Sequence, residues 1–189
     1  PSVETNAKIR WGGLSKIMTP KNMNGKNLIT QLYEIGISPD DIDIVINSHL
    51  HPDHCGCNDF FKNAEFYCHK KEFQSANETN ASQMGYIKNE WDLPMPLKQI
   101  KQSYDVFDDS RIVTINLPGH TPGSQCFSVN KNLVSGDTLF INGCGRVDLP
   151  GSDSEQMYHS LQHLCSLPND TIPVSYTHLR AHETLRWRG

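Results

Sequence analysis

Hydrophobic and polar positions along the chain follow two periodicities, one of about 3.6 residues and one of about 2 residues. Apolar residues recur at helical spacing over residues 24–36 and 152–166, and both stretches predict amphipathic helices. Apolar and polar residues alternate over residues 42–46 and 111–117, which predicts strands, and a further short strand is predicted over residues 64–68. Strands that alternate with helices are typical of an α/β fold, in which helices pack against a sheet.

The rest of the pattern adds two strands and one less regular region. Residues 125–129 and 132–137 have strand character on either side of a short turn. From residue 70 to residue 102 the pattern is irregularly helical, and ordinary packing is its expected role. The helix over residues 152–166 is predicted to begin with a capping box, because Ser152 is followed three residues later by Glu155. With 189 residues, the chain has the size of one domain.

Histidines follow two of the predicted strands. The stretch NSHLHPDHCG comes directly after the strand at residues 42–46 and contains His49, His51, Asp53 and His54. The loop after the strand at residues 111–117 carries His120 within PGHTPGS. Zinc binds imidazole nitrogen and carboxylate oxygen, and a hydrolytic site keeps one position open for water. On an extended loop the first two histidines can point the same way while the other pair turns toward a second point. The spacing therefore predicts two metal sites, about 3.5 to 4 Å apart.

The pattern H-x-H-x-D-H resembles the signature of the metallo-β-lactamase superfamily, and LPGHTPGS and SGDTLF follow it in the expected order. The resemblance implies the α/β fold of that superfamily, a four-layer αβ/βα sandwich. It also implies a ligand set, in which the first metal takes His49, His51 and His120, the second takes Asp53 and His54, and Asp137 bridges the two. One further ligand of the second metal is missing, so the second site is expected to be the weaker one.

Such a centre implies a metal-dependent hydrolase that contains two zinc ions, with iron(II) as the alternative metal. A bound metal lowers the pKa of its water molecule to about 7 and polarises a carbonyl group, so the nucleophile is expected to be a metal-bound hydroxide. Asp53 is the expected catalytic residue, because it would orient this nucleophile and accept its proton. The substrate is expected to be a small molecule with an ester, lactone or thioester bond.

Two branches of the superfamily share the resemblance. Residues 1–123 are similar to N-acyl-homoserine lactonases in RWGGLSKIMTPK, INSHLHPDHCG and GYIKNEWDLP. Residues 124–172 look more like hydroxyacylglutathione hydrolase (glyoxalase II) in GSQCFSV and LVSGDTLFINGCGRVDLPG. Lactonases of this type carry a tyrosine that contacts the substrate three residues after the bridging aspartate, and Phe140 stands at that position. Lactone and thioester substrates both stay open, and weak turnover of both is expected.

A basic residue at position 146 bears on the same choice. Arg146 matches a residue that helps glyoxalase II to hold glutathione, but Asp148 stands where that family has an aromatic residue. Arg146 is equally expected to form a structural ion pair with Asp148 or Asp153. The stretch GCGRVD also resembles the persulfide dioxygenases, relatives that hold a single iron with two histidines and an aspartate. An oxidoreductase is therefore an alternative function.

Both ends of the chain are expected to depart from the family pattern. Nothing before Trp11 resembles the opening strands of the family, and residues 173–189 lack the expected strand and histidine-bearing turn. We therefore predict that residues 1–172 form a domain that is truncated at both ends. Residues 173–189 are predicted to be a non-native tail, in which His178 and His182 bind no metal. An inactive metal-binding fragment, or a chimera of two genes, is the alternative to an enzyme.

Composition narrows the expected partners and location. The formal net charge is −4, and lysine and arginine do not cluster before the last ten residues, which argues against nucleic acid as a partner. No apolar run approaches the roughly 20 residues that cross a bilayer, which argues against a membrane partner. The six cysteines are scattered and are expected to be reduced thiols in a cytoplasmic protein.

Overall fold

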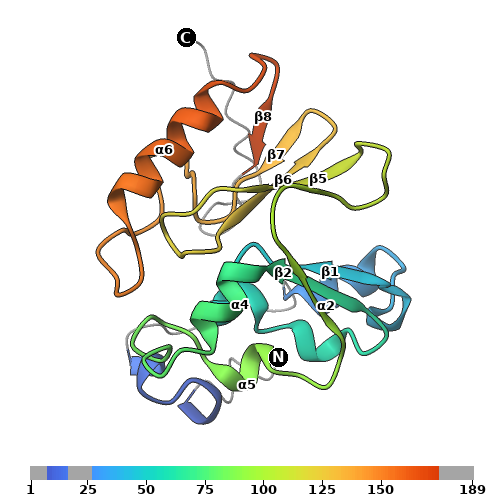
Figure 1. Cartoon of the computed structure of the whole chain (residues 1–189). Helices are drawn as coiled ribbons and strands as arrows, with labels where there is room; N and C mark the ends of the chain where they lie inside the picture. Colours follow the sequence, from blue (N-terminus) through green and yellow to red (C-terminus); the bar gives the residue numbers. More distant parts are fainter. Residues whose placement is uncertain (1–7, 17–26, 175–189) are drawn as a thin grey trace.

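The computed structural model describes residues 8–16 and 27–174, which form two β-sheets and the helices around them (Figure 1). The α-helices are α2 (Leu28–Glu34), α3 (Pro52–Cys55), α4 (Lys70–Ala76), α5 (Lys88–Trp91) and α6 (Ser154–Cys165). Short 3-10 helices are η1 (Gly12–Lys16), η2 (Pro39–Asp41) and η3 (Asn58–Phe60). The strands are β1 (Ile44–Ile46), β2 (Glu65–His69), β3 (Leu97–Ile100), β4 (Tyr104–Asp105), β5 (Ile112–Asn116), β6 (Gln125–Val129), β7 (Asn132–Val134) and β8 (Ile172–Val174).

The first sheet is parallel and has the strand order β1-β2-β3. Val45 lies opposite Phe66, and Tyr67 lies opposite Lys98. Parallel neighbours need a crossover connection, and here α3 and η3 connect β1 to β2 while α4 and α5 connect β2 to β3. Figure 1 shows α2, α4 and α5 in the same half of the molecule as this sheet. The first half therefore places helices beside a parallel sheet.

The second sheet has the order β4-β5-β6-β7-β8 and is antiparallel except for its last pair. In its centre Thr114 lies opposite Phe127. The parallel pairing of β7 with β8 follows from the crossover through α6, which lies alongside this sheet in Figure 1. Two sheets, each with helices of its own, confirm the α/β architecture predicted from the sequence.

The two halves meet where β1 ends and β6 begins. The backbone N–H of Gln125 donates to the carbonyl oxygen of Ser48 at 3.0 Å. The side-chain amide of Gln125 donates to the carbonyl oxygen of Asn47 at 2.8 Å. Gln125 is almost fully buried, so these hydrogen bonds are shielded from water. The loop that follows β1 is therefore attached to the second sheet immediately before its first histidine.

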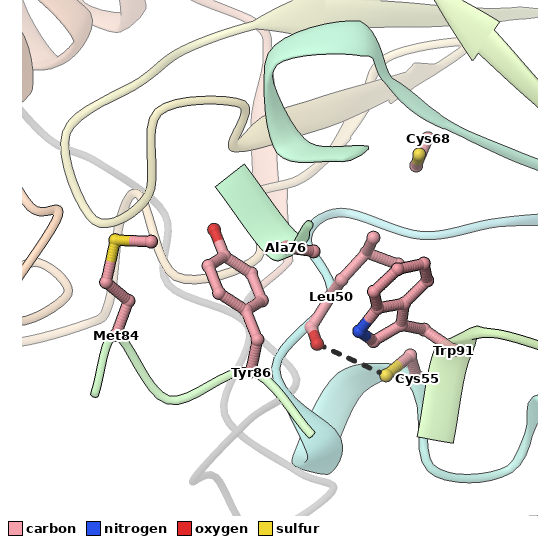
Figure 2. Packing of buried hydrophobic residues seen from close by; sticks show 7 residues of the cluster. All are labelled: Leu50, Cys55, Cys68, Ala76, Met84, Tyr86 and Trp91. Atoms are coloured by element: carbon pink, nitrogen blue, oxygen red, sulfur yellow. Dashed lines mark hydrogen bonds between the residues drawn. The ribbon is translucent and has the colours of Figure 1, made fainter. Parts of the chain in front are cut away.

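A hydrophobic core lies behind this loop (Figure 2). It consists of Leu50, Cys55, Cys68, Ala76, Met84, Tyr86 and Trp91. Leu50 is completely buried, and its carbonyl oxygen accepts a hydrogen bond from Cys55 Sγ at 3.4 Å. Side chains alternate along an extended segment. Because Leu50 points into the core, its neighbours His49 and His51 face the opposite side of the loop. Burial of Met84, Tyr86 and Trp91 also confirms the ordinary packing predicted for this stretch.

Most elements lie where the hydrophobic pattern predicts them. Helix α2 covers the centre of its predicted stretch and ends before Gly36, whose φ of +77° suits a residue without a side chain. The strands predicted at residues 42–46, 64–68 and 111–117 form as β1, β2 and β5. The two later predicted strands form as β6 and β7.

The prediction of an irregular helix over residues 70–102 is wrong at its end, where Leu97–Ile100 form strand β3. Pro94 and Pro96 precede this segment and cannot donate the hydrogen bonds of a helix. The edge of β2 offers its backbone groups instead, and all four residues of β3 pair with it. The partner strand, which local sequence does not show, decides the structure here.

Helix α6 begins one residue later than the predicted capping box. Asp153 is the N-cap, and its Oδ1 accepts hydrogen bonds from the backbone N–H groups of Glu155 and Gln156, both at 2.9 Å. Ser152 donates instead to the carbonyl oxygen of Leu149 at 2.6 Å. Aspartate and serine are comparable caps, so the turn that precedes the helix decides between them.

At the carboxyl end, strand β8 continues past the predicted boundary between domain and tail. Pro173 and Val174 pair with Leu133 and Val134 of β7. β8 lies at the edge of the described sheet, and an edge strand tolerates proline because one of its sides makes no ladder hydrogen bonds. The rest of the predicted tail, with His178 and His182, lies outside the described residues, and its non-native origin stays a prediction.

None of the helices in residues 8–16 and 27–174 is long and apolar enough to cross a membrane. All six cysteines fall within these residues and are free thiols. Cys55, Cys68 and Cys126 are buried, and burial raises the pKa of each thiol, so these side chains act as apolar packing residues.

The cap of α6 can be tested by mutation. Asp153→Ala removes the acceptor for two backbone N–H groups, and we expect the free energy of unfolding to fall by about 1 kcal/mol. Asp153→Asn keeps an acceptor oxygen and should lose clearly less. Urea denaturation followed by circular dichroism measures both variants, and equal losses would contradict the assigned cap.

Candidate metal centre

Two groups of possible metal ligands lie where the loops of the two sheets meet, and the groups share one histidine. The first group is His49, His51 and His120, all buried. The second group is His49, His54 and Asp137. Within each group the ligand atoms lie within 4.8 Å of one another. The loop after β1 supplies His49 and His51, α3 supplies His54, and the second half supplies His120 and Asp137.

The hydrogen bonds of the first group determine which ring nitrogens face its centre. His51 Nε2 lies 2.9 Å from the carbonyl oxygen of Met84, and His120 Nδ1 lies 2.9 Å from the carbonyl oxygen of Arg146. A carbonyl oxygen only accepts, so both of these nitrogens carry a hydrogen and donate it. The lone pairs then lie on His51 Nδ1 and His120 Nε2, which are only 3.2 Å apart.

This arrangement fits a cation. Two lone pairs that face each other repel unless a positive ion or a shared proton lies between them. His49 Nε2 is buried and has no hydrogen-bond partner among the described residues. Its other ring nitrogen, Nδ1, lies 3.2 Å from Ser48 Oγ. A metal ion would satisfy all three inward nitrogens. The hydrogen bond at the outer nitrogen of each ring would then orient that ring, as is usual for a metal-bound histidine.

Burial keeps His49 and His51 of the first group neutral. Desolvation, together with the neighbouring His120, lowers the pKa of His51 to about 3. Desolvation also lowers the pKa of His49 well below its usual value, together with the adjacent histidines. The charged form of each ring is therefore disfavoured near neutral pH. Neutral imidazole is the form that binds a metal, so little proton competition is expected at neutral pH.

Asp137 contacts both groups. Its Oδ1 lies 3.1 Å from His54 Nε2, and its Oδ2 lies 3.5 Å from His120 Nε2. Burial alone would raise the pKa of Asp137, but the contact with His54 and the neighbouring His120 and His51 together outweigh burial and lower the pKa. Burial would likewise lower the pKa of His54, yet the contacts with Asp137 and Asp53 raise it overall. Asp137 thus belongs to the second group and also contacts His120 of the first, and its role as a bridging ligand stays a prediction.

Asp53 lies beside the second group and is not part of it. It sits in the first turn of α3, and its Oδ2 lies 3.6 Å from His54 Nε2. Its side chain is 31% exposed, against 2% for His54 and 11% for Asp137. Five of the six residues predicted as ligands therefore meet in the two groups, with His49 common to both. Asp53 is the member that faces solvent, and its assignments as ligand and as catalytic residue stay predictions.

Residues that hold the histidines are not visible in the sequence pattern. Met84 and Arg146 act through backbone carbonyl groups, which any residue could supply. The ring of Tyr86 packs against His51 with centroids 5.1 Å apart. Glu72 is completely buried and hydrogen-bonds to both histidine-bearing loops. Only the position of Ser48 next to His49 could have suggested a role from sequence alone.

The two predicted substrate residues lie on the segment that follows Asp137. The guanidinium of Arg146 makes two hydrogen bonds of 2.9 Å to the carboxylate of Asp148, in line with the ion pair weighed from the sequence. Both side chains are exposed, at 65% and 68%. The backbone N–H of Phe140 donates to the carbonyl oxygen of Gly143 at 2.8 Å. Arg146 thus contributes its carbonyl group to the centre, and contact of either side chain with a substrate stays a prediction.

Known proteins share this fold and parts of this sequence. The chain is 32% identical over 133 residues to the N-acyl homoserine lactonase AttM of Azorhizobium caulinodans, which covers 67% of the chain and 51% of that protein. It is 54% identical over 55 residues to the hydroxyacylglutathione hydrolase of Tolumonas auensis, which covers 29% of the chain and 21% of that protein. The chain therefore spans about half the length of the lactonases that it matches.

A solved structure and a family model extend the comparison. The structure of an N-acyl homoserine lactone hydrolase with N-hexanoyl-L-homoserine bound at its catalytic metal centre superposes with a TM-score of 0.71 at 23% identity. The match covers 93% of the chain and 71% of that protein, and it shows a common fold. The model of the metallo-beta-lactamase superfamily matches residues 17–176, which include both histidine-bearing loops, Asp137 and β8. With two sheets, a converging histidine group and this match over most of its length, the chain belongs to the metallo-beta-lactamase superfamily.

Proposed function

We propose that the protein is a metal-dependent hydrolase that opens N-acyl homoserine lactones or closely related cyclic esters. The observation that carries the proposal is the buried convergence of His49, His51 and His120 with their lone pairs directed inward. The similarity to AttM over two thirds of the chain supports a lactone as substrate. Zinc is the proposed metal, because three neutral imidazoles and a carboxylate suit its preference for nitrogen and oxygen ligands, and iron(II) is the alternative.

The first group would hold the tighter metal, because it offers three neutral nitrogens that are already oriented by hydrogen bonds. His54 and Asp137 would hold the second metal, with Asp53 beside them. When bound, such metals supply an acidic water molecule and polarise the carbonyl group of an ester. The protein's own groups must then orient the substrate and move protons.

Asp53 is the group best placed to move a proton. Its carboxylate is the most exposed of the candidate ligands, and it lies 3.6 Å from the buried ring of His54. In hydrolysis the attacking water loses a proton as its oxygen bonds to the carbonyl carbon. We infer that Asp53 accepts this proton and returns it to the alcohol oxygen when the carbon–oxygen bond of the lactone breaks. Solvent access at Asp53 allows the product to leave and the next water to enter.

A thioester is the second candidate substrate class, because the chain is 54% identical to a hydroxyacylglutathione hydrolase over 55 residues. The structure favours it less. Asp148 binds the guanidinium of Arg146 through two hydrogen bonds, so this side chain is already engaged and is less available to a glutathione carboxylate. A lactone has no carboxylate to be recognised, and it depends on the metals and on the segment around Phe140.

Metal analysis tests the first group. We expect His120→Ala and His51→Ala to lose most bound zinc, because each removes one of only three inward nitrogens. The loss should exceed the about 10- to 100-fold that removal of an orienting partner costs. His54→Ala should mainly affect the second metal. His159→Ala, on the exposed face of α6, is the matched control and should keep the zinc content of the parent.

Zinc in the His120→Ala variant equal to that of the parent would sink the assignment of the first group. One equivalent of iron in the parent, together with oxygen uptake on glutathione persulfide, would favour the dioxygenase alternative instead. A parent chain that binds metal but hydrolyses neither class of substrate would support the reading of an inactive metal-binding fragment.

Asp53→Asn tests the proton transfer. The amide keeps an oxygen at the same place but cannot accept the proton, so kcat for lactone opening should fall by about 10²- to 10⁴-fold. The tighter metal should stay bound, as measured by elemental analysis of the same sample. An unchanged kcat, or a loss that added zinc restores, would show that Asp53 is not the proton acceptor.

Phe140→Tyr tests the choice of substrate. The parent should open N-hexanoyl-homoserine lactone with a kcat/KM below the usual range of about 10⁴ to 10⁸ M⁻¹s⁻¹, because Phe140 offers no hydroxyl group. The added hydroxyl should raise kcat/KM for the lactone and leave hydrolysis of S-lactoylglutathione unchanged. Phe140→Leu is the control for altered packing. If the parent prefers S-lactoylglutathione, the thioester candidate replaces the lactone.

A further inference from the structure

A carboxylate that is neither a candidate ligand nor a proton acceptor lies between the two histidine-bearing loops. Glu72, on α4, is completely buried. Its Oε1 accepts a hydrogen bond from the backbone N–H of Leu50 at 2.9 Å. Its Oε2 accepts one from Thr121 Oγ1 at 2.7 Å and another from the backbone N–H of Gly123 at 3.1 Å. Each oxygen of the carboxylate therefore holds a different loop.

The residues that Glu72 holds are the immediate neighbours of the candidate ligands. Leu50 separates His49 from His51, and Thr121 directly follows His120. The first loop leaves the parallel sheet after β1, and the second leaves the antiparallel sheet after β5. The distance between the loops is not set by either sheet alone. Glu72 bonds to both loops, in addition to the two hydrogen bonds that Gln125 makes with the first loop.

Three hydrogen-bond donors surround the carboxylate of Glu72. All three donors point at the carboxylate, and Thr121 Oγ1 in turn lies 2.6 Å from Ser124 Oγ, which completes a chain of hydroxyl groups. Burial raises the pKa of Glu72, and the hydrogen bonds from Leu50 and Thr121 offset this rise only in part. Replacing a buried acceptor that serves three donors costs free energy of folding. Each donor left without an acceptor is buried away from water and cannot hydrogen-bond to it instead.

The second loop also packs against α4 without space for a side chain at residue 123. A Cβ atom on Gly123 would lie 2.2 Å from the backbone nitrogen of Glu72 and 2.5 Å from its Cβ atom. Only glycine permits this approach, which brings the N–H of Gly123 within reach of the carboxylate. The contact therefore depends on a close fit and on the charge together.

We propose that Glu72 is a positioning residue that sets the separation of His120 from His49 and His51, and thereby the metal affinity of the first group. The proposal rests on the proposed function to the extent that this group is a metal site. It predicts that a change at Glu72 alters the metal site itself, beyond any effect on stability.

Glu72→Gln is the test, with Co²⁺ as the probe of the first group. Glutamine has nearly the same shape, but its NH₂ group would face an N–H or O–H donor, so one loop must move away. We expect the Co²⁺ affinity, measured by competition with a chelator, to fall about 10- to 100-fold. The visible ligand-field bands of bound Co²⁺ should also change in position or intensity, because the geometry of the three imidazoles changes.

Glu90→Gln is the matched control. Glu90 is a second buried carboxylate in the same half of the molecule, and its partner is Arg10, whose Nε lies 2.8 Å from Glu90 Oε1. The control should lower the melting temperature while leaving the Co²⁺ spectrum and affinity at parent values. Thr121→Val, which removes one donor and keeps the volume, is the second variant if Glu72→Gln fails to fold. It should weaken Co²⁺ binding in the same direction.

Co²⁺ spectra and affinities at parent values in Glu72→Gln, or in Thr121→Val where the first variant does not fold, would overturn the proposal. A parent that binds no Co²⁺ would overturn it as well, because there would be no site to position. If the proposed function fails but the positioning role of Glu72 holds, the outcome is different. The parent then binds Co²⁺, and Glu72→Gln weakens this binding as expected, yet the parent opens no lactone.

Discussion

Two loops from different sheets must meet with their histidine side chains buried, and this constraint governs the centre of the molecule. A buried polar group is costly unless it is hydrogen-bonded, and three imidazole rings bring six ring nitrogens into this space. The outer nitrogens lie within hydrogen-bond distance of Met84 O, Arg146 O and Ser48 Oγ. Among the described residues, the inner nitrogen of His49 has no hydrogen-bond partner, and those of His51 and His120 face each other at 3.2 Å, so a cation would satisfy all three at once.

Charge is arranged around this centre in layers. Neutral histidines lie innermost, because burial makes the protonated form unfavourable. The carboxylate of Asp137 lies between the two groups, and Glu72 lies behind the first one. Asp53 is on the solvent side. Buried carboxylates next to neutral imidazoles favour a bound cation, so metal binding is expected to stabilise the folded chain as well as to supply chemistry.

Backbone groups do much of the positioning, and this changes how a family motif can be carried over to one chain. Arg146 matches a substrate-binding residue of the glyoxalase II family in type and place. In the structure its guanidinium binds Asp148, while its carbonyl group orients His120. Asp148, which departs from the motif, is the reason that the side chain is engaged. A match in residue type therefore leaves the contact with a substrate a prediction, because the neighbouring Asp148 already supplies a partner for the side chain.

The sequence by itself determined the local elements and the chemistry. Alternation predicted the strands that precede both loops, helical spacing predicted α2 and α6, and the grouping of His49, His51 and His54 predicted a metal centre. These features are local, because side-chain periodicity and ligand spacing are set over a few residues. Tertiary structure alone decided that Leu97–Ile100 pair as a strand, that Asp153 caps α6, and that Glu72 joins the loops. Each depends on a partner distant in the chain or on a turn whose geometry is set by packing, and a hydrogen bond exists only once folding has brought donor and acceptor within about 3 Å.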